Sequence, residues 1–194
     1  MGPSLGCSGL LYLKTWACSS LIVVVLIVGV MSDSHDSIEC VRRASRVFSE
    51  AGVSAVLHLG DIVAPFTLRF LAESLRVRFE AVFGNNDGER VGLLRVAQAY
   101  GVNLGDQPRV VVFNGRRLLL THGFGDPNTT YEVVSALAES KRWDAVLYGH
   151  THEASIDYRR SVLLLNPGDC SGYLGRPSVA LLDLKTMKAR LVEL

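Results

Sequence analysis

Residues 21–35 read LIVVVLIVGVMSDSH, an apolar run that leads without a break into the D-x-H triplet of Asp33 and His35. The run is dominated by β-branched Val and Ile, which favour strands over helices. It is also shorter than the ~18 apolar residues that a membrane-spanning helix needs. A signal peptide or membrane helix is the alternative, but we predict a buried strand over residues 21–31 whose end carries the two polar side chains.

The size and composition of the chain suit one globular domain. It has 194 residues, of which 48% are hydrophobic, so it can bury a core and is not expected to be disordered. Its 20 Lys and Arg residues nearly balance its 19 Asp and Glu residues, so no charge-driven binding of nucleic acid is expected. We predict a domain over residues 21–194. Residues 1–20 are predicted to be an N-terminal extension that is disordered or reflects a start site placed too early.

The four cysteines are scattered and form no C-x-x-C pair, so a cysteine zinc site is not expected. A domain of this size does not depend on disulfides, and reduced thiols in the cytoplasm are the simplest interpretation. No membrane association is expected, and the sequence leaves open whether the protein forms a homo-oligomer.

Short apolar runs alternate with helical patterns in the first part of the chain. We predict strands over residues 21–31, 54–59 and 78–83, and helices over 37–51, 65–76 and near 90–100. This order predicts parallel strands with right-handed crossovers.

Asn114-Gly115 is a strong hairpin signal in the second half of the chain. We predict strands over 109–113 and 116–121, a helix over 129–140, a strand over 144–148, and antiparallel strands over 153–158, 161–166, 178–184 and 187–193. Two sheets packed face to face, with helices outside, fit this order.

Polar residues gather at the ends of five predicted strands. They are Asp33 and His35, Gly60-Asp61, Gly84-Asn85-Asn86-Asp87, His122-Gly123, and Gly149-His150-Thr151-His152. Ligands of an open α/β sheet bind beyond the carboxyl ends of its strands, so five loops are expected to bring their side chains to one edge. The glycines are expected to allow sharp turns beside the site.

The mixture of carboxylate, amide and imidazole side chains indicates a metal site. Carboxylate and amide oxygens suit hard cations such as Mn²⁺, while imidazole suits Zn, Fe and Ni. Two such ions about 3.5–4 Å apart can clamp the oxygens of a phosphoryl displacement. Four of the five histidines lie in these motifs. The fifth, His58, is predicted to be a hydrogen-bonded residue inside a strand, with a role in orienting a ligand as the alternative.

The order D-x-H, G-D, G-N-x-D, H-G and G-H-T-H resembles the calcineurin-like metallophosphoesterase superfamily over residues 21–194. The single-domain size and the late Asn166-Pro167-Gly168 resemble its small bacterial and archaeal phosphodiesterases. The resemblance implies a four-layer α/β/β/α sandwich of two mixed sheets flanked by helices. It also implies two divalent metal ions, with Mn²⁺ as the first choice and Ni²⁺, Fe²⁺ or Zn²⁺ as alternatives.

The resemblance also assigns individual residues. Asp33, His35 and His152 would bind one metal, Asn85, His122 and His150 the other, and Asp61 would bridge the two. Asp61, Asn85 and His122 are the residues expected to act in catalysis. Two positions depart from the family. Asn86 stands where many members carry a His that is thought to protonate the leaving group, and Asp169 stands where Ser is common, with no function attached to it.

Phosphodiester hydrolysis is therefore the predicted activity, with a metal-bridging hydroxide attacking a small-molecule phosphoester. Asn86 cannot act as an acid, which favours diesters or activated leaving groups. The alternatives are a phosphomonoesterase with the same site and a non-catalytic scaffold protein of the same fold. The sequence does not identify the natural substrate.

Overall fold

The computed structural model describes residues 26–194, so the predicted extension and the start of the first predicted strand lie outside the described part. The strands are β1 (Ile27–Met31), β2 (Ala55–His58), β3 (Arg78–Val82), β4 (Asn103–Gly105), β5 (Arg109–Phe113), β6 (Arg116–Leu120), β7 (Ala145–Leu147), β8 (Ser155–Arg159), β9 (Val162–Asn166), β10 (Ser178–Asp183) and β11 (Lys188–Glu193). The helices are α1 (Ile38–Glu50), α2 (Pro65–Leu75), α3 (Arg90–Tyr100) and α4 (Pro127–Glu139).

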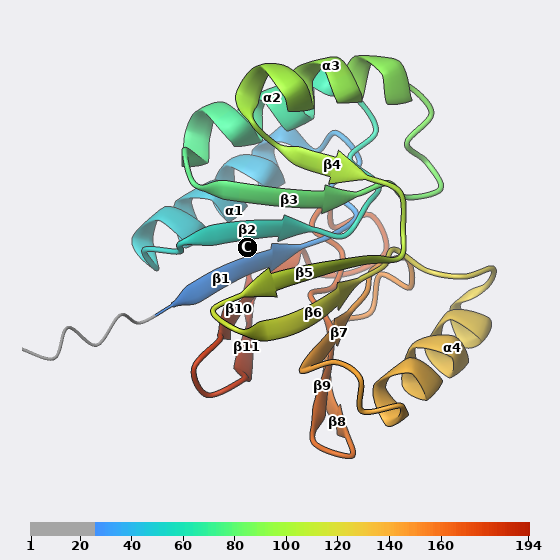
Figure 1. Ribbon diagram of the computed structural model, residues 1–194. Coiled ribbons are helices and arrows are strands. Elements are labelled where there is room, and N and C mark those ends of the chain that lie inside the picture. The colour runs from blue at the N-terminus through green and yellow to red at the C-terminus, as the bar shows by residue number, and fades with distance from the viewer. Residues whose placement is uncertain (1–25) are drawn as a thin grey trace, which may run out of the picture.

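The strands form two mixed sheets that face each other (Figure 1). The first sheet has six strands in the order β11-β10-β1-β2-β3-β4, and β1 to β4 run parallel. The second sheet has five strands in the order β5-β6-β7-β9-β8. Helical crossovers join β1 to β2, β2 to β3, and β6 to β7, which is why these neighbours are parallel.

Helices cover the outer faces of both sheets (Figure 1): α1, α2 and α3 lie on the first sheet, and α4 lies on the second. Three buried apolar layers result: one under α1, α2 and α3, one between the sheets, and one under α4. Successive side chains of a strand point to opposite faces and so enter different layers. In β1, Val28 and Val30 belong to the layer between the sheets, while Met31 belongs to the layer beneath the helices. The Phe48 ring packs so closely over Gly29 that a Cβ there would lie 2.7 Å from it. The predicted four-layer α/β/β/α sandwich is confirmed.

Two details of the sheets differ from the sequence prediction. Antiparallel pairing is confirmed for β8 with β9 and for β10 and β11, but β9 also pairs parallel with β7 on its other side, where Val146 lies opposite Leu164. The reason is that β8 takes the edge of the sheet and β9 returns between β8 and β7. Strand β4 was not predicted, because its three residues contain one buried apolar side chain, Leu104, and no alternation.

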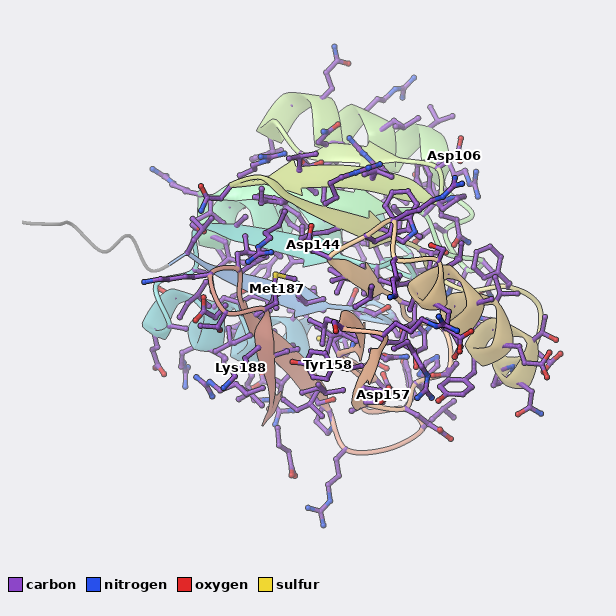
Figure 2. The ribbon with its side chains drawn as sticks, turned by 60° about the horizontal axis from the view of Figure 1, so that its bottom comes forward. Asp106, Asp144, Asp157, Tyr158, Met187 and Lys188 are labelled. Atoms are coloured by element: carbon purple, nitrogen blue, oxygen red, sulfur yellow. The ribbon has the colours of Figure 1, made fainter. Side chains whose placement is uncertain are left out.

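The two sheets are tied together at the end where β1, β2, β6 and β7 begin. Figure 2 shows Asp144, Tyr158 and Met187 gathered there. The Tyr158 hydroxyl donates to the Met187 carbonyl at 3.0 Å. Arg116 pairs with Asp144 at 2.8 Å and donates to the Leu184 carbonyl at 3.2 Å. These contacts lie at the opposite end of the sheets from the polar loops. A substitution at this end therefore leaves the polar loops untouched.

Deleting residues 1–19 is expected to leave a folded protein with an unchanged unfolding midpoint. The described core begins at Leu26, and chain termini are usually dispensable unless they are tied down. Within residues 26–194, no helix combines the length and apolar character needed to cross a membrane. Circular dichroism, thermal unfolding and metal content of the full and shortened chains test the prediction. Aggregation of the shortened chain, or loss of its metal, would count against it.

Candidate metal centre

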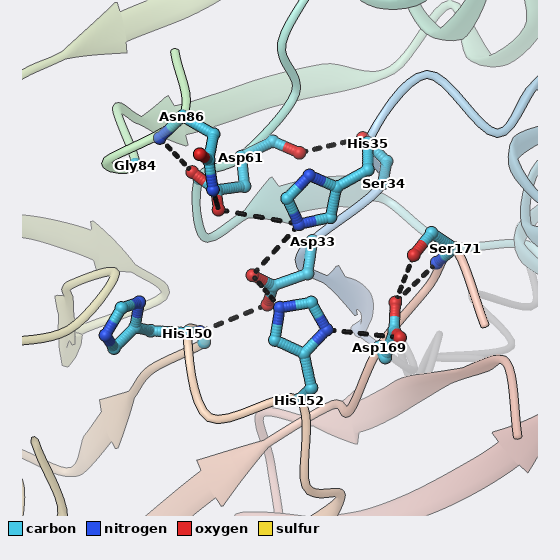
Figure 3. Close-up of polar contacts among 12 residues, drawn as sticks. Asp33, Ser34, His35, Asp61, Gly84, Asn86, His150, His152, Asp169 and Ser171 are labelled. Atoms are coloured by element: carbon cyan, nitrogen blue, oxygen red, sulfur yellow. Dashed lines mark hydrogen bonds and ion pairs between the residues drawn. The ribbon is translucent and has the colours of Figure 1, made fainter. Parts of the chain in front are cut away.

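The five polar loops meet at one edge of the sandwich, as Figure 3 shows for several of their residues. Three of these loops follow β1, β2 and β3 of the first sheet, and two follow β6 and β7 of the second. Backbone hydrogen bonds join neighbouring loops: the Asp33 N–H donates to the Gly60 carbonyl at 3.0 Å, and the Gly149 N–H donates to the His122 carbonyl at 2.9 Å. The site is therefore assembled from both sheets.

Asp33, His35 and His152 form a first group whose ligand atoms lie within 4.8 Å of one another. The Nε2 atoms of His35 and His152 lie 3.9 Å and 3.5 Å from Asp33 Oδ1, and the two imidazole rings stack at 5.3 Å (Figure 3). Asp33 Oδ1 and His35 Nε2 are buried and have no hydrogen-bond partner among residues 26–194. An unpaired buried polar atom costs about 1–3 kcal/mol, and a cation held by these atoms would remove that cost. The group fits a metal ion.

Asp61 lies between this group and a second one. Its Oδ2 atom is 3.5 Å from His35 Nε2 and 3.4 Å from His122 Nε2. Asp33, Asp61 and His122 also bring ligand atoms within 4.8 Å of one another. The Asn85 side-chain oxygen lies 2.9 Å from His122 Nε2. The Asp61 carboxylate thus lies between ring nitrogens of both groups.

His150 lies at the rim of the second group. Its ring meets the His122 ring edge-on at 5.0 Å, and its backbone N–H donates to Asp33 Oδ2 at 3.1 Å (Figure 3). Six of the predicted ligands lie in direct contact with one another, whereas His150 reaches the others through its backbone and its ring face. The six are Asp33, His35, Asp61, Asn85, His122 and His152.

Backbone carbonyls fix the tautomers of two histidines. His122 Nδ1 lies 2.8 Å from the Leu59 carbonyl, and His150 Nε2 lies 2.6 Å from the Gly125 carbonyl. Because a carbonyl only accepts, each of these nitrogens carries the hydrogen, and the other ring nitrogen keeps its lone pair when the ring is neutral. Metal-binding histidines usually donate their second N–H in this way. His122 and His150 therefore each keep one ring nitrogen whose lone pair can bind a cation.

Five of the seven predicted ligands have left-handed backbone angles that non-glycine residues rarely adopt. They are Asp33, His35, Asp61, His150 and His152, with φ between 39° and 69°. Such a conformation costs on the order of 1–3 kcal/mol per residue and persists where the surroundings impose it, commonly at functional sites. The fold therefore sustains strain where the predicted ligands lie.

The motif glycines were expected to allow sharp turns, but most of them are needed because neighbouring loops approach closely. Of the four motif glycines Gly60, Gly84, Gly123 and Gly149, only Gly60, with φ of 98°, has the left-handed conformation that a sharp turn requires. A Cβ on Gly84 would overlap the backbone nitrogen of Asp61, and one on Gly149 would overlap the Ser32 hydroxyl. A Cβ on Gly123 would lie 2.5 Å from that of His150. These three glycines are needed because the loops approach one another too closely for a side chain.

The charges of the two buried carboxylates are set by different surroundings. Burial raises the pKa of Asp33 above its ordinary value. Burial also opposes ionisation of Asp61, but the neighbouring His122 ring and the hydrogen bonds from Asn86 outweigh it and hold the pKa of Asp61 well below its usual range. Asp61 is therefore ionised at neutral pH. A bound cation would favour ionisation of both groups.

Two residues outside the predicted ligand set hold the ligand loops in place. Asp87 accepts backbone N–H groups of Asp61 at 3.0 Å and Gly84 at 2.7 Å, and so fixes two loops at once. Gln107 accepts the N–H of His122 at 2.6 Å from outside all the motifs. The Asp87 position was visible within G-N-N-D, whereas nothing in the sequence pointed to Gln107.

His58 is hydrogen-bonded inside its strand, as predicted. Its Nε2 atom lies 3.0 Å from the Ser34 hydroxyl, and the Gly60 N–H donates to its Nδ1 atom at 3.3 Å. Burial lowers the pKa of His58 to about 3, so the ring is neutral. Since Ser34 lies between Asp33 and His35, His58 supports the loop that carries these two ligands.

Asn86 contacts the central carboxylate directly. Its backbone N–H donates to Asp61 Oδ1 at 2.8 Å, and its side-chain amide donates to Asp61 Oδ2 at 2.7 Å (Figure 3). Asn86 therefore orients the carboxylate that lies between His35 and His122.

This geometry agrees with the comparisons with known proteins. Residues 26–187 match the domain described as the calcineurin-like phosphoesterase superfamily domain. The chain belongs to the calcineurin-like phosphoesterase superfamily. The predicted family is confirmed, and so is the prediction that the chain is a hydrolase.

Relatives within the calcineurin-like superfamily cover most of the chain. Phosphodiesterase MJ0936 of Methanocaldococcus jannaschii is 34% identical over 165 residues, which are 84% of this chain and 96% of that protein. Phosphodiesterase YfcE of Escherichia coli K12 is 28% identical over 72% of this chain and 77% of its own length.

Solved structures support the fold. A novel archaeal phosphodiesterase superposes with a TM-score of 0.79 at 33% identity, covering 87% of this chain and all of that one. Vps29 of Chaetomium thermophilum, with a TM-score of 0.64 and 17% identity over 86% of this chain and 91% of that one, shares the fold.

Proposed function

We propose that this protein hydrolyses phosphodiesters with the help of two divalent cations. The observation that carries the proposal is the place of Asp61, whose Oδ2 atom lies within 3.5 Å of ring nitrogens from both groups. A single carboxylate at the centre of two donor sets suits a pair of ions better than one. The names of the two phosphodiesterases that the chain resembles support the same reaction class.

The donor atoms divide between the two ions. Asp33, His35 and His152 would hold one ion, Asn85, His122 and His150 the other, and Asp61 would contact both. When bound, the ions would supply an activated water and neutralise the charge that develops on the phosphoryl oxygens. The absence of thiolate from this set favours Mn²⁺ as the first choice, with Ni²⁺, Fe²⁺ and Zn²⁺ as alternatives.

The protein's own residues orient these donors. The Leu59 and Gly125 carbonyls keep the imidazoles of His122 and His150 in the required tautomers. Asn86 holds both oxygens of Asp61 and has no proton to give to a leaving group. Diesters and esters with good leaving groups are therefore the substrates proposed. The domain is proposed to span residues 21–194 and to act in the cytoplasm, where the buried thiols of Cys40 and Cys170 would stay reduced.

An activity profile of the metal-loaded protein tests this function. We expect kcat/KM for a bis-aryl phosphodiester to exceed that for the matching aryl phosphate monoester by at least about 10-fold. Assays of both esters and of cyclic nucleotides, repeated with each of the four metals, provide the comparison. A preference for monoesters would favour the phosphomonoesterase alternative. Metal binding without turnover of any ester would favour the scaffold alternative.

A further inference from the structure

Asp169 is a buried carboxylate with partners on both of its oxygens. It follows Asn166-Pro167-Gly168 after β9 and is 1% exposed. Its Oδ1 atom accepts the N–H groups of Ser171 at 2.9 Å and Gly172 at 3.1 Å, and its Oδ2 atom accepts the Leu174 N–H at 2.9 Å. Donors on both oxygens prevent the carboxylate from rotating.

The same carboxylate faces the predicted ligand His152 (Figure 3). Oδ2 of Asp169 lies 3.1 Å from His152 Nδ1, while His152 Nε2 points to Asp33 and lies 3.5 Å from its Oδ1. The first pair is close enough for a charge-assisted contact but does not have hydrogen-bond geometry, and His152 Nδ1 has no hydrogen-bond partner within residues 26–194. A carboxylate only accepts, so it keeps the hydrogen on Nδ1 and the lone pair on Nε2. Nε2 is the atom that faces Asp33, the next predicted metal ligand.

The loop clamped by Asp169 also reaches a second ligand of the same group. Between the bonded residues Gly172 and Leu174 lies Tyr173, whose ring meets the His35 ring edge-on at 6.0 Å. His35 in turn stacks on His152. One fixed carboxylate thus lies beside His152 and also holds the backbone on both sides of Tyr173, the residue whose ring lies near His35.

We propose that Asp169 is a positioning residue for the ion held by Asp33, His35 and His152, an inference that rests on the proposed function. It touches neither the ion nor the substrate in this role. It orients the imidazole of His152 so that Nε2 faces the ion, and it increases the electron density on that nitrogen. Loss of such an outer partner typically lowers metal affinity about 10–100-fold.

Mn²⁺ binding to the full-length, chelator-treated protein tests the proposal without reference to turnover. In Asp169→Asn we expect the Kd of one binding step to rise about 10–100-fold and the Kd of the other step to stay within about 3-fold. The amide keeps the shape of the carboxylate but has only one accepting oxygen for donors on two sides. Asp144→Asn, which removes a paired carboxylate at the opposite end of the sheets, should leave both steps unchanged. If Asp169→Asn does not fold, Asp169→Ser provides the same comparison.

A second background identifies the affected ion. In His35→Ala, which weakens the same ion, adding Asp169→Asn should not change the Kd of the remaining step. Equal weakening of both steps would indicate a general structural role and overturn the proposal, as would unchanged binding in a folded Asp169→Asn protein. If the wild-type protein itself binds no Mn²⁺, the proposed function fails and this inference fails with it. Wild-type binding with an unaffected Asp169→Asn contradicts the positioning role alone.

Discussion

Replacing Asp61 by alanine is expected to remove both metal ions and to lower kcat/KM for a bis-aryl phosphodiester by roughly 10³-fold. The ions together supply several kcal/mol of transition-state stabilisation, and each 1.36 kcal/mol corresponds to a factor of ten in rate. The Asp61 carboxylate lies 3.5 Å from His35 Nε2 and 3.4 Å from His122 Nε2, so its loss should disturb both groups. His35→Ala should instead lower the metal content by one ion per chain.

Elemental analysis of the purified variants measures the metal content, and Asp144→Ala is the matched control. Asp144 pairs with Arg116 at the far end of the sheets, so its loss removes an acidic side chain without touching the site. Thermal unfolding of all variants separates loss of metal from loss of fold. Unchanged stoichiometry in Asp61→Ala would show that Asp61 is not the bridge.

Changing Asn86 to histidine should help substrates with poor leaving groups most. Expelling an alkoxide needs a proton, and a placed general acid typically contributes about 10²–10⁴-fold. Aryl leaving groups need that proton far less. The native enzyme should therefore show a steep dependence of kcat/KM on leaving-group pKa. Asn86→His should flatten it, with gains of up to about 10²-fold for alkyl esters.

Asn86→Ala is the control for this substitution, because it removes the 2.7 Å contact to Asp61 without adding an acid. An alternative role for Asn86, tolerance of a left-handed backbone, has no support, since Asn86 is not among the residues with positive φ. A series of aryl and alkyl phosphoesters, assayed at equal metal content, gives the slopes. If Asn86→His and Asn86→Ala show the same slope as the native enzyme, the leaving-group argument is wrong.

The parts of the fold that follow from local patterns could be predicted. Helix α2 begins at Pro65 and the β5–β6 hairpin turns at Asn114-Gly115, as expected from proline and turn chemistry. The parallel pairing of β9 with β7 could not be predicted, because it depends on which strand takes the edge of the sheet. Strand β4 is defined by its pairing with β3 and has no pattern of its own.

In the candidate site, too, the features with a local sequence pattern could be predicted, and those set by tertiary contacts could not. Side chains at strand ends were identifiable because their residue types match a known chemistry and their positions share one sheet edge. Gln107 was missed because an amide that supports His122 from another loop leaves no spacing in the sequence. The function of Asp169 depends on the approach of His152 from a different strand, which only the tertiary structure shows. The glycines were found, but the contacts that require them were not.

Removal and return of metal tests the two-ion phosphodiesterase most directly. The protein is treated with chelator until elemental analysis finds no transition metal, and bis-aryl phosphodiester turnover is then followed as Mn²⁺ is added. We predict that turnover is lost in the metal-free protein and returns in full when two Mn²⁺ ions are bound per chain. Full activity in the verified metal-free protein would contradict the account, and full recovery with one bound ion would contradict the bridging role of Asp61.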